Sequence, residues 1–131
     1  MENVSFDDFP FEYPVRDSGD YRIPAISVVT ESGIRHADFR FEEWRVLPDK
    51  PSLPGLPSII AKEGGAETLE VVCRDETAEL KLYLYYTILP DIGVLMRHQK
   101  LENTGDRPIC IENIQSMSLE LPAKEYDCLI L

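Results

Sequence analysis

Few residues of this sequence have the types and spacing that chemistry requires. His36 and His98 lie far apart, and neither has His, Cys or Asp neighbours at the spacing of a zinc site. Adjacent acids occur at residues 7–8 and 42–43. Neighbouring strand residues point to opposite faces, so these acids do not face one substrate as an acid–base pair must. The sequence therefore predicts no catalytic residue and no metal ligand.

Charge and motif content exclude further classes of function. The chain has no nucleophile elbow, no glycine-rich loop between a strand and a helix, and no paired-cysteine motif, so no cofactor is expected. Its 24 acidic and 13 basic residues give a net charge of −11. A field of that sign repels phosphate backbones and anionic lipid headgroups. We therefore expect neither a nucleic-acid partner nor a membrane partner.

Aromatic side chains offer one route to ligand binding. Phe39 and Phe41 are two residues apart, as are Tyr83 and Tyr85, so each pair would share a strand face. Together with Trp44 they could form a platform on which a sugar ring stacks. Cross-strand packing within a sheet is the more ordinary use of such pairs.

The elements that would position these residues are strands, because alternation with a period of two dominates the chain. The 131 residues allow one domain, residues 1–131, and are too few for a (β/α)₈ barrel, which needs at least ~200. Turns at intervals of about ten residues predict an all-β antiparallel β-sandwich. The predicted strands are 25–30, 37–47, 68–74, 79–88, 94–103 and 108–121.

Two hairpins are predicted within this pattern, one joining 68–74 to 79–88 and one joining 25–30 to 37–47. In the last predicted strand the apolar parity changes, because Cys110 and Ile114 alternate out of step with their apolar neighbours. A β-bulge, a bend, or a strand covered on both faces would each produce this change.

A proline-rich segment interrupts the strands at residues 48–57, with four prolines in ten residues. Proline lacks the N–H that a central strand needs to donate. We therefore expect an ordered loop or an edge crossing there.

The compartment is indicated by the N-terminal residues and the cysteines. Acidic residues stand where a secretion signal would carry basic ones, and the apolar runs are too short to span a bilayer. Cys73, Cys110 and Cys128 are odd in number and widely spaced, so we interpret them as reduced core thiols. A soluble, cytoplasmic protein is expected.

Several unusual short motifs occur in a distinctive order along most of the chain. They are EYP at 12–14, GDYRIPA at 19–25, DFRF at 38–41, KPSLPGLP at 50–57, AETLE at 66–70, YYTI at 85–88, LENTGD at 101–106 and YD at 126–127, with Arg97 between YYTI and LENTGD. Their order resembles the N-terminal domain of glycoside hydrolase family 36 α-galactosidases. Asp49 departs from the glycine usual in that family, which leaves the shape of the proline loop open.

The resemblance implies a truncated piece of a larger, supersandwich-like β-sandwich domain. Family members are several times longer and continue into a (β/α)₈ barrel that holds two catalytic aspartates. By resemblance the full-length enzyme hydrolyses terminal α-D-galactosides, such as melibiose and raffinose, with retention. No catalytic residue carries over to this chain, which is predicted to be inactive alone.

The implied role is non-catalytic packing against the barrel and assembly of a homo-oligomer. The interface or sugar-proximal candidates are Trp44 and four residues of the proline-rich loop, Lys50, Pro51, Leu53 and Leu56. One alternative is an independent carbohydrate-binding module that takes a galactoside. The other is a β-sandwich adaptor that binds proteins through an exposed edge strand.

Overall fold

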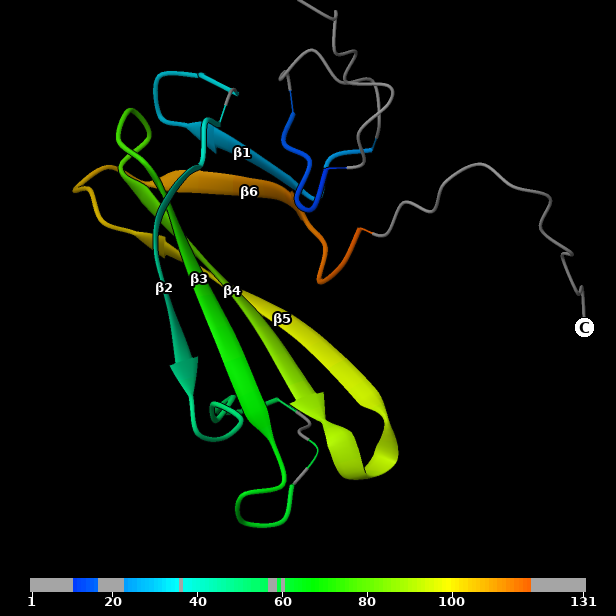
Figure 1. The fold of residues 1–131 in the computed structure, drawn as a ribbon. Helices are drawn as coiled ribbons and strands as arrows, with labels where there is room; N and C mark the ends of the chain where they lie inside the picture. The colour runs from blue at the N-terminus through cyan, green and yellow to red at the C-terminus, as the bar shows by residue number, and fades with distance from the viewer. Residues whose placement is uncertain (1–10, 17–22, 36, 57–58, 60, 119–131) are drawn as a thin grey trace, which may run out of the picture.

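The computed structural model describes residues 11–16, 23–35, 37–56, 59 and 61–118, and their regular structure is β apart from one 3₁₀ turn (Figure 1). The predicted all-β class is confirmed. The strands are β1 (Ile26–Thr30), β2 (Arg40–Leu47), β3 (Glu67–Asp75), β4 (Leu80–Leu89), β5 (Val94–Asn103) and β6 (Ile109–Ile114), and the 3₁₀ turn η2 (Pro90–Ile92) precedes β5.

The strands form two antiparallel sheets. One has four strands in the order β2-β3-β4-β5, and the other pairs β1 with β6. The predicted hairpin between 25–30 and 37–47 is therefore wrong. After β1 the chain closes a local turn, in which the Gly33 N–H bonds to Thr30 O, and it then passes through buried Ala37 into the other sheet. Strands close in sequence are thus separated by a change of sheet.

The predicted hairpin between 68–74 and 79–88 is confirmed as β3 and β4, which pair in unbroken register. Asp75, which is buried, organises its turn by accepting bonds from the backbone N–H groups of Thr77 and Ala78. Its second carboxylate oxygen accepts the Asp38 N–H at 2.8 Å and so ties the start of β2 to this turn. Glu79 has a φ of 54°, a turn conformation, so β4 begins at Leu80.

The core lies where the two sheets meet. Ile26 and Val28 of β1 pack with Leu80 of β4, and all three are at most 1% exposed. Leu101 of β5 and Ile109 of β6 pack against them. The two-stranded sheet thus covers one end of the larger sheet and leaves the other end without a facing layer of described strands (Figure 1).

The last strand is shorter than predicted and contains a bulge. Ser27 pairs with Asn113, but Val28 pairs with Ile111, so Glu112 is the extra residue of β6. A bulge was one of the three explanations for the parity change, and it is the correct one. Residues 119–131, which include the end of the predicted strand and Cys128, lie outside the described residues.

The cysteine prediction is partly wrong. Cys73 is half-buried and Cys110 is exposed, and both are free thiols. Strand alternation explains the exposure of Cys110, since its neighbour Ile109 packs against the core and Cys110 points the other way.

Truncating Leu80 tests the position of the core. Leu80→Ala should reduce the free energy of unfolding by about 2–5 kcal/mol, because it removes buried methyl groups and leaves a cavity. Leu95→Ala, at a residue that is 63% exposed, should change it by less than about 0.5 kcal/mol. Urea denaturation of the two variants measures both values, and equal losses would place the core elsewhere.

Candidate interaction surface

The four-stranded sheet has two different faces. Leu80, Leu82 and Leu84 of β4 point to the face that carries the core, which we call the packed face. Tyr83 and Tyr85 of the same strand point to the other face, the polar face. The cross-strand registers assign each of the remaining paired residues in the four strands to one of these two faces.

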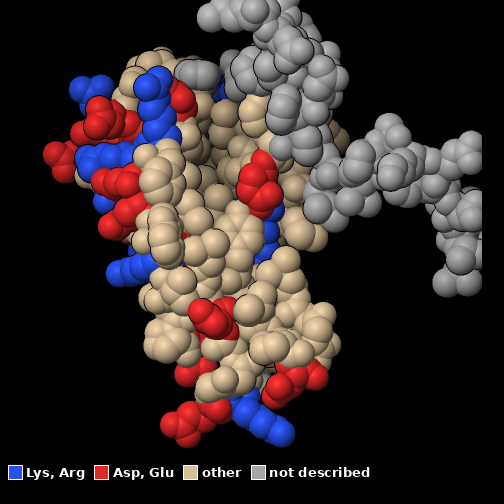
Figure 2. Space-filling view, in the orientation of Figure 1, with Lys and Arg blue, Asp and Glu red and all other residues tan. Residues whose placement is uncertain are grey.

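Large apolar side chains remain exposed on the uncovered half of the packed face. They come from all four strands, and Trp44 and Leu95 are more than three-fifths exposed. In Figure 2 most of the surface over this part of the sheet is uncharged, but acidic side chains interrupt it, and exposed Glu67, opposite Ile88, lies on the same face. We call this set of residues the open patch: Phe41, Trp44, Val46, Leu69, Ile88 and Leu95. Monomeric proteins rarely leave an apolar patch that crosses a whole sheet in contact with water.

A β-bulge in β2 enlarges the open patch. Phe41 pairs with Cys73 and Glu43 pairs with Val72, so Glu42 is the additional residue. The bulge restores Phe41 and Trp44, three residues apart, to the same face. Sequence alternation alone would have placed them on opposite faces, and this is why the patch was missed.

A hollow of about 470 Å³ lies within the packed face next to the open patch. Its floor is formed by apolar side chains of the two central strands, Leu69, Val71 and Leu84 among them. The rings of Phe41 and Tyr86 flank this floor. Its remaining lining residues are Glu12, Tyr13 and Cys73.

Arg97 holds the segment 11–16 beside this hollow. The guanidinium bonds to the Glu12 carboxylate at 3.0 Å and to the Glu12 carbonyl at 3.1 Å. It also lies over the rings of Tyr13 and Tyr86, 5.7 and 5.1 Å from their centroids. Burial raises the pKa of Tyr13 to about 12, so its hydroxyl stays neutral. This cation therefore anchors the N-terminal segment to the sheet.

The polar face carries a different arrangement. Glu70 has a side chain only 3% exposed, and it is paired with the Arg45 guanidinium. Burial, and then a hydrogen bond to Glu70, raise the pKa of Tyr85 to about 12. Burial, and then the nearby Lys50 ammonium, lower the pKa of His98, so this ring is neutral at pH 7. Glu70, Arg45 and Tyr85 are thus paired on the polar face, whereas Nε2 of His98 is buried with no hydrogen-bond partner among the described residues.

The tyrosines of the polar face do not form an open sugar platform. Tyr83 and Tyr85 stack with centroids 6.5 Å apart. His98 stacks on Tyr85 at 4.4 Å, and the Lys100 ammonium lies 4.7 Å from the centre of the Tyr83 ring. The ordinary interpretation, cross-strand packing, is confirmed for this pair, because each ring already has partners.

The predicted interface residues lie on different sides of the sheet. Trp44 belongs to the open patch, whereas Lys50 lies close to His98 on the polar face. In the same loop Leu56 is 64% exposed, and Pro51 and Leu53 are half-buried. No single flat surface therefore contains Trp44 and Lys50 together.

Within the described residues, no group of three or more His, Cys, Asp and Glu side chains could hold a metal ion. His36 lies outside the described residues. In the same part of the chain, no helix has the length and apolar character needed to cross a membrane.

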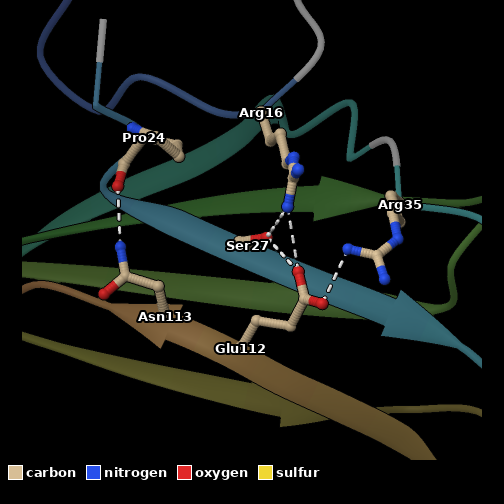
Figure 3. A network of polar contacts seen from close by, with 6 residues as sticks. All are labelled: Arg16, Pro24, Ser27, Arg35, Glu112 and Asn113. Carbon is tan, nitrogen blue, oxygen red and sulfur yellow. Dashed lines mark hydrogen bonds and ion pairs between the residues drawn. The ribbon is translucent and has the colours of Figure 1, made fainter.

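A second polar anchor lies at the bulge of β6 (Figure 3). Glu112 accepts bonds from the Ser27 hydroxyl at 2.9 Å, from Arg16 at 3.0 Å and from Arg35 at 2.7 Å. Beside it, Asn113 donates to the carbonyl of Pro24 at 2.9 Å. The bulged residue thus joins β6 to Arg16, Ser27 and Arg35, which lie 77 to 96 residues earlier in the sequence.

Lowering the pH should remove the contribution of this anchor to stability. The Ser27 bond first, and then Arg35 and Arg16, hold the pKa of Glu112 below its usual 4.5. A lowered carboxyl pKa contributes stability above pH 4.5 that is lost as the pH falls through the lowered value. Glu112→Gln should therefore be less stable than the wild type at pH 7, and the difference should shrink toward pH 3. Urea midpoints across that range measure it, and a constant difference would contradict the assignment.

Comparison with known proteins gives the surface its context. The family model described as the glycosyl hydrolase family 36 N-terminal domain matches residues 1–131. The chain is 37% identical over 125 residues to the bifunctional alpha-galactosidase/sucrose kinase AgaSK of Mediterraneibacter gnavus, which is 95% of this chain and 13% of that protein. It is 36% identical over 124 residues to alpha-galactosidase AgaA of Geobacillus stearothermophilus, which is 94% of this chain and 17% of that protein.

Solved structures agree with the sequence comparison. The galactosidase domain of AgaSK superposes with a TM-score of 0.82 at 37% identity, over 87% of this chain and 16% of that chain. AgaA in complex with stachyose gives 0.81 at 35% identity, over 87% and 16%. The chain spans less than a fifth of the length of these relatives. Its matched sequence and its fold agree, and the chain belongs to the N-terminal domain family of the family 36 glycosyl hydrolases.

Proposed function

We propose that this chain acts as a non-catalytic N-terminal domain of an α-galactosidase, in which a catalytic (β/α)₈ barrel of the same polypeptide hydrolyses terminal α-D-galactosides such as melibiose and raffinose. The observation that carries the proposal is that the chain matches a relative along nearly its whole length but covers only a small part of that relative. Nearly the whole chain matches alpha-galactosidase AgaA, yet the match accounts for 17% of that protein. One solved relative is an AgaA variant in complex with raffinose.

The physical role we propose is packing and assembly. A sheet with one apolar face gains stability when another layer covers that face. The open patch supplies such a face, and Trp44 at its edge strand fits a contact residue. Lys50, Pro51, Leu53 and Leu56 would contribute from the proline-rich loop, whose stiffness lowers the entropy cost of ordering it.

Assembly into a homo-oligomer belongs to the same proposal. The loop would then lie near a neighbouring subunit and border its galactoside site, as the family resemblance implies. A cytoplasmic location is proposed too, and the free thiols of Cys73 and Cys110 fit a reducing compartment.

The test replaces the matched stretch of Geobacillus AgaA with this chain and assays a chromogenic α-galactoside. The chain alone should not hydrolyse it, and AgaA without its matched stretch should be inactive or insoluble. The chimera should be active, because the inserted domain supplies the same packing surfaces. AgaA itself is the positive control. Hydrolysis by the purified chain alone, or a soluble and inactive chimera, would contradict the proposal.

A further inference from the structure

We propose that His98 is a pH-sensitive latch for the proline-rich loop. While the ring is neutral, Lys50 at the start of the loop stays beside it on the polar face. When the ring takes up a proton from solvent, the two cations repel each other and the start of the loop withdraws from β5. The latch concerns the shape of the loop within this chain, so the proposal goes beyond the proposed function and does not depend on it.

A cross-strand row of side chains fixes the position of His98. Its members are Arg45, Glu70, Tyr85 and His98, one from each strand of the four-stranded sheet in the order β2 to β5. The His98 ring lies almost parallel to Tyr85, with centroids 4.4 Å apart and 9° between the planes. Tyr85 in turn bonds to Glu70, which pairs with Arg45. Contacts that cross the whole sheet therefore hold the imidazole in place.

One ring nitrogen of His98 lies where a proton is unfavourable. Nε2 is buried and has no hydrogen-bond partner in the part of the chain that the structure describes. A neutral imidazole can leave this nitrogen unprotonated, whereas an imidazolium carries an N–H on both nitrogens. A buried N–H without an acceptor costs free energy, and it costs more when it belongs to a cation. The surroundings thus accept the neutral ring and oppose the protonated one.

The Lys50 ammonium opposes protonation in the same direction. Burial first, and then this ammonium, lower the pKa of His98 below its ordinary 6.5. The ring is therefore neutral at pH 7, and the repulsion appears only as the pH falls through the lowered value. We expect the loop to be held at neutral pH and released in mild acid.

The other charged groups around the ring are already balanced. On β5, Lys100 lies two residues from His98 on the same face, and Glu102 pairs with it at 2.9 Å. Across the sheet, the Glu70 carboxylate would attract an imidazolium, but Arg45 neutralises it. The charge that an added proton would meet is therefore that of Lys50.

The stack on Tyr85 indicates which partner moves. An aromatic face attracts a cation, so the His98 ring is favoured on Tyr85 in its protonated form as well. Lys50 lies in a loop and directly precedes Pro51. A residue before proline is restricted to extended backbone, and proline fixes its own φ. Displacement of Lys50 is therefore passed on to Pro51 and Leu53, since the backbone between them has little freedom to absorb it.

Nuclear magnetic resonance of the chain from about pH 8 to about pH 5 tests the latch. The His98 signals, distinguished from those of His36 with a His36→Gln sample, should titrate with a midpoint below 6.5. Nuclear Overhauser contacts between the Lys50 methylenes and the His98 ring should be present at the higher pH and disappear with that midpoint. The amide signals of Lys50 and Leu53 should shift with the same midpoint.

Substitutions separate the latch from a general effect of acid. His98→Phe keeps an aromatic ring on Tyr85 and removes the titrating group, so the amide signals of the loop should no longer shift over this range. Lys50→Met removes the ammonium and should raise the pKa of His98 toward 6.5. Lys81→Met is the matched control. Lys81 lies near the start of β4, on the same face, and is paired with Glu42 at 2.9 Å, so the His98 midpoint should stay unchanged.

Contacts between Lys50 and His98 that persist below the His98 midpoint would overturn the proposal, and the unsubstituted chain alone decides this point. Loop amides that still titrate in His98→Phe would also overturn it. So would a His98 pKa that Lys50→Met leaves unchanged, or that Lys81→Met raises equally. None of these measurements involves hydrolysis, so failure of the latch and failure of the proposed function are distinguishable.

Discussion

Contact between the two-stranded sheet and one end of the four-stranded sheet is the interaction on which the remaining structure depends. Ile26, Val28 and Leu80 are removed from water there, and burial of each such side chain contributes on the order of 2 kcal/mol. A chain of this size has few other apolar clusters to rely on. The turn at Asp75 and the bulge at Glu112 both lie where they can align these strands.

Two polar anchors supplement this small core. Glu112 joins β6 to Arg16, Ser27 and Arg35, and Arg97 joins β5 to Glu12. Both anchors hold segment 11–16, which belongs to no named strand. Arg97 has a side chain only 7% exposed, which strengthens its bonds, whereas Arg16, Arg35 and Glu112 are 31–49% exposed, so each of their ion pairs contributes little on its own. They act together with the bond from the Ala25 N–H to the Pro14 carbonyl, the bridge between Val15 and Ile26, and the packing of Val15 on the core.

Local features of the fold could be predicted from the sequence, and non-local ones could not. The β3–β4 hairpin follows from alternation and from Asp75, which organises its own turn. The pairing of β1 with β6 joins strands from near opposite ends of the described chain, and nothing near Ile26 specifies that partner. For the site, alternation paired Phe41 with Phe39, whereas the bulge at Glu42 places Phe41 on the face of Trp44. The role of Trp44 as a contact residue stays a prediction.

The difference between the covered and the uncovered end of the four-stranded sheet connects the fold to the proposed function. A sheet closed at one end and open at the other fits the proposed packing role, in which a further layer covers the open end. Trp44, the only tryptophan of the chain, lies on that open part, so quenching of its fluorescence by acrylamide is the most direct measurement. In the monomeric chain we predict a red-shifted emission that is quenched nearly as well as free tryptophan. A blue-shifted, protected emission in the monomer would show that the chain covers this face itself, and would contradict the account.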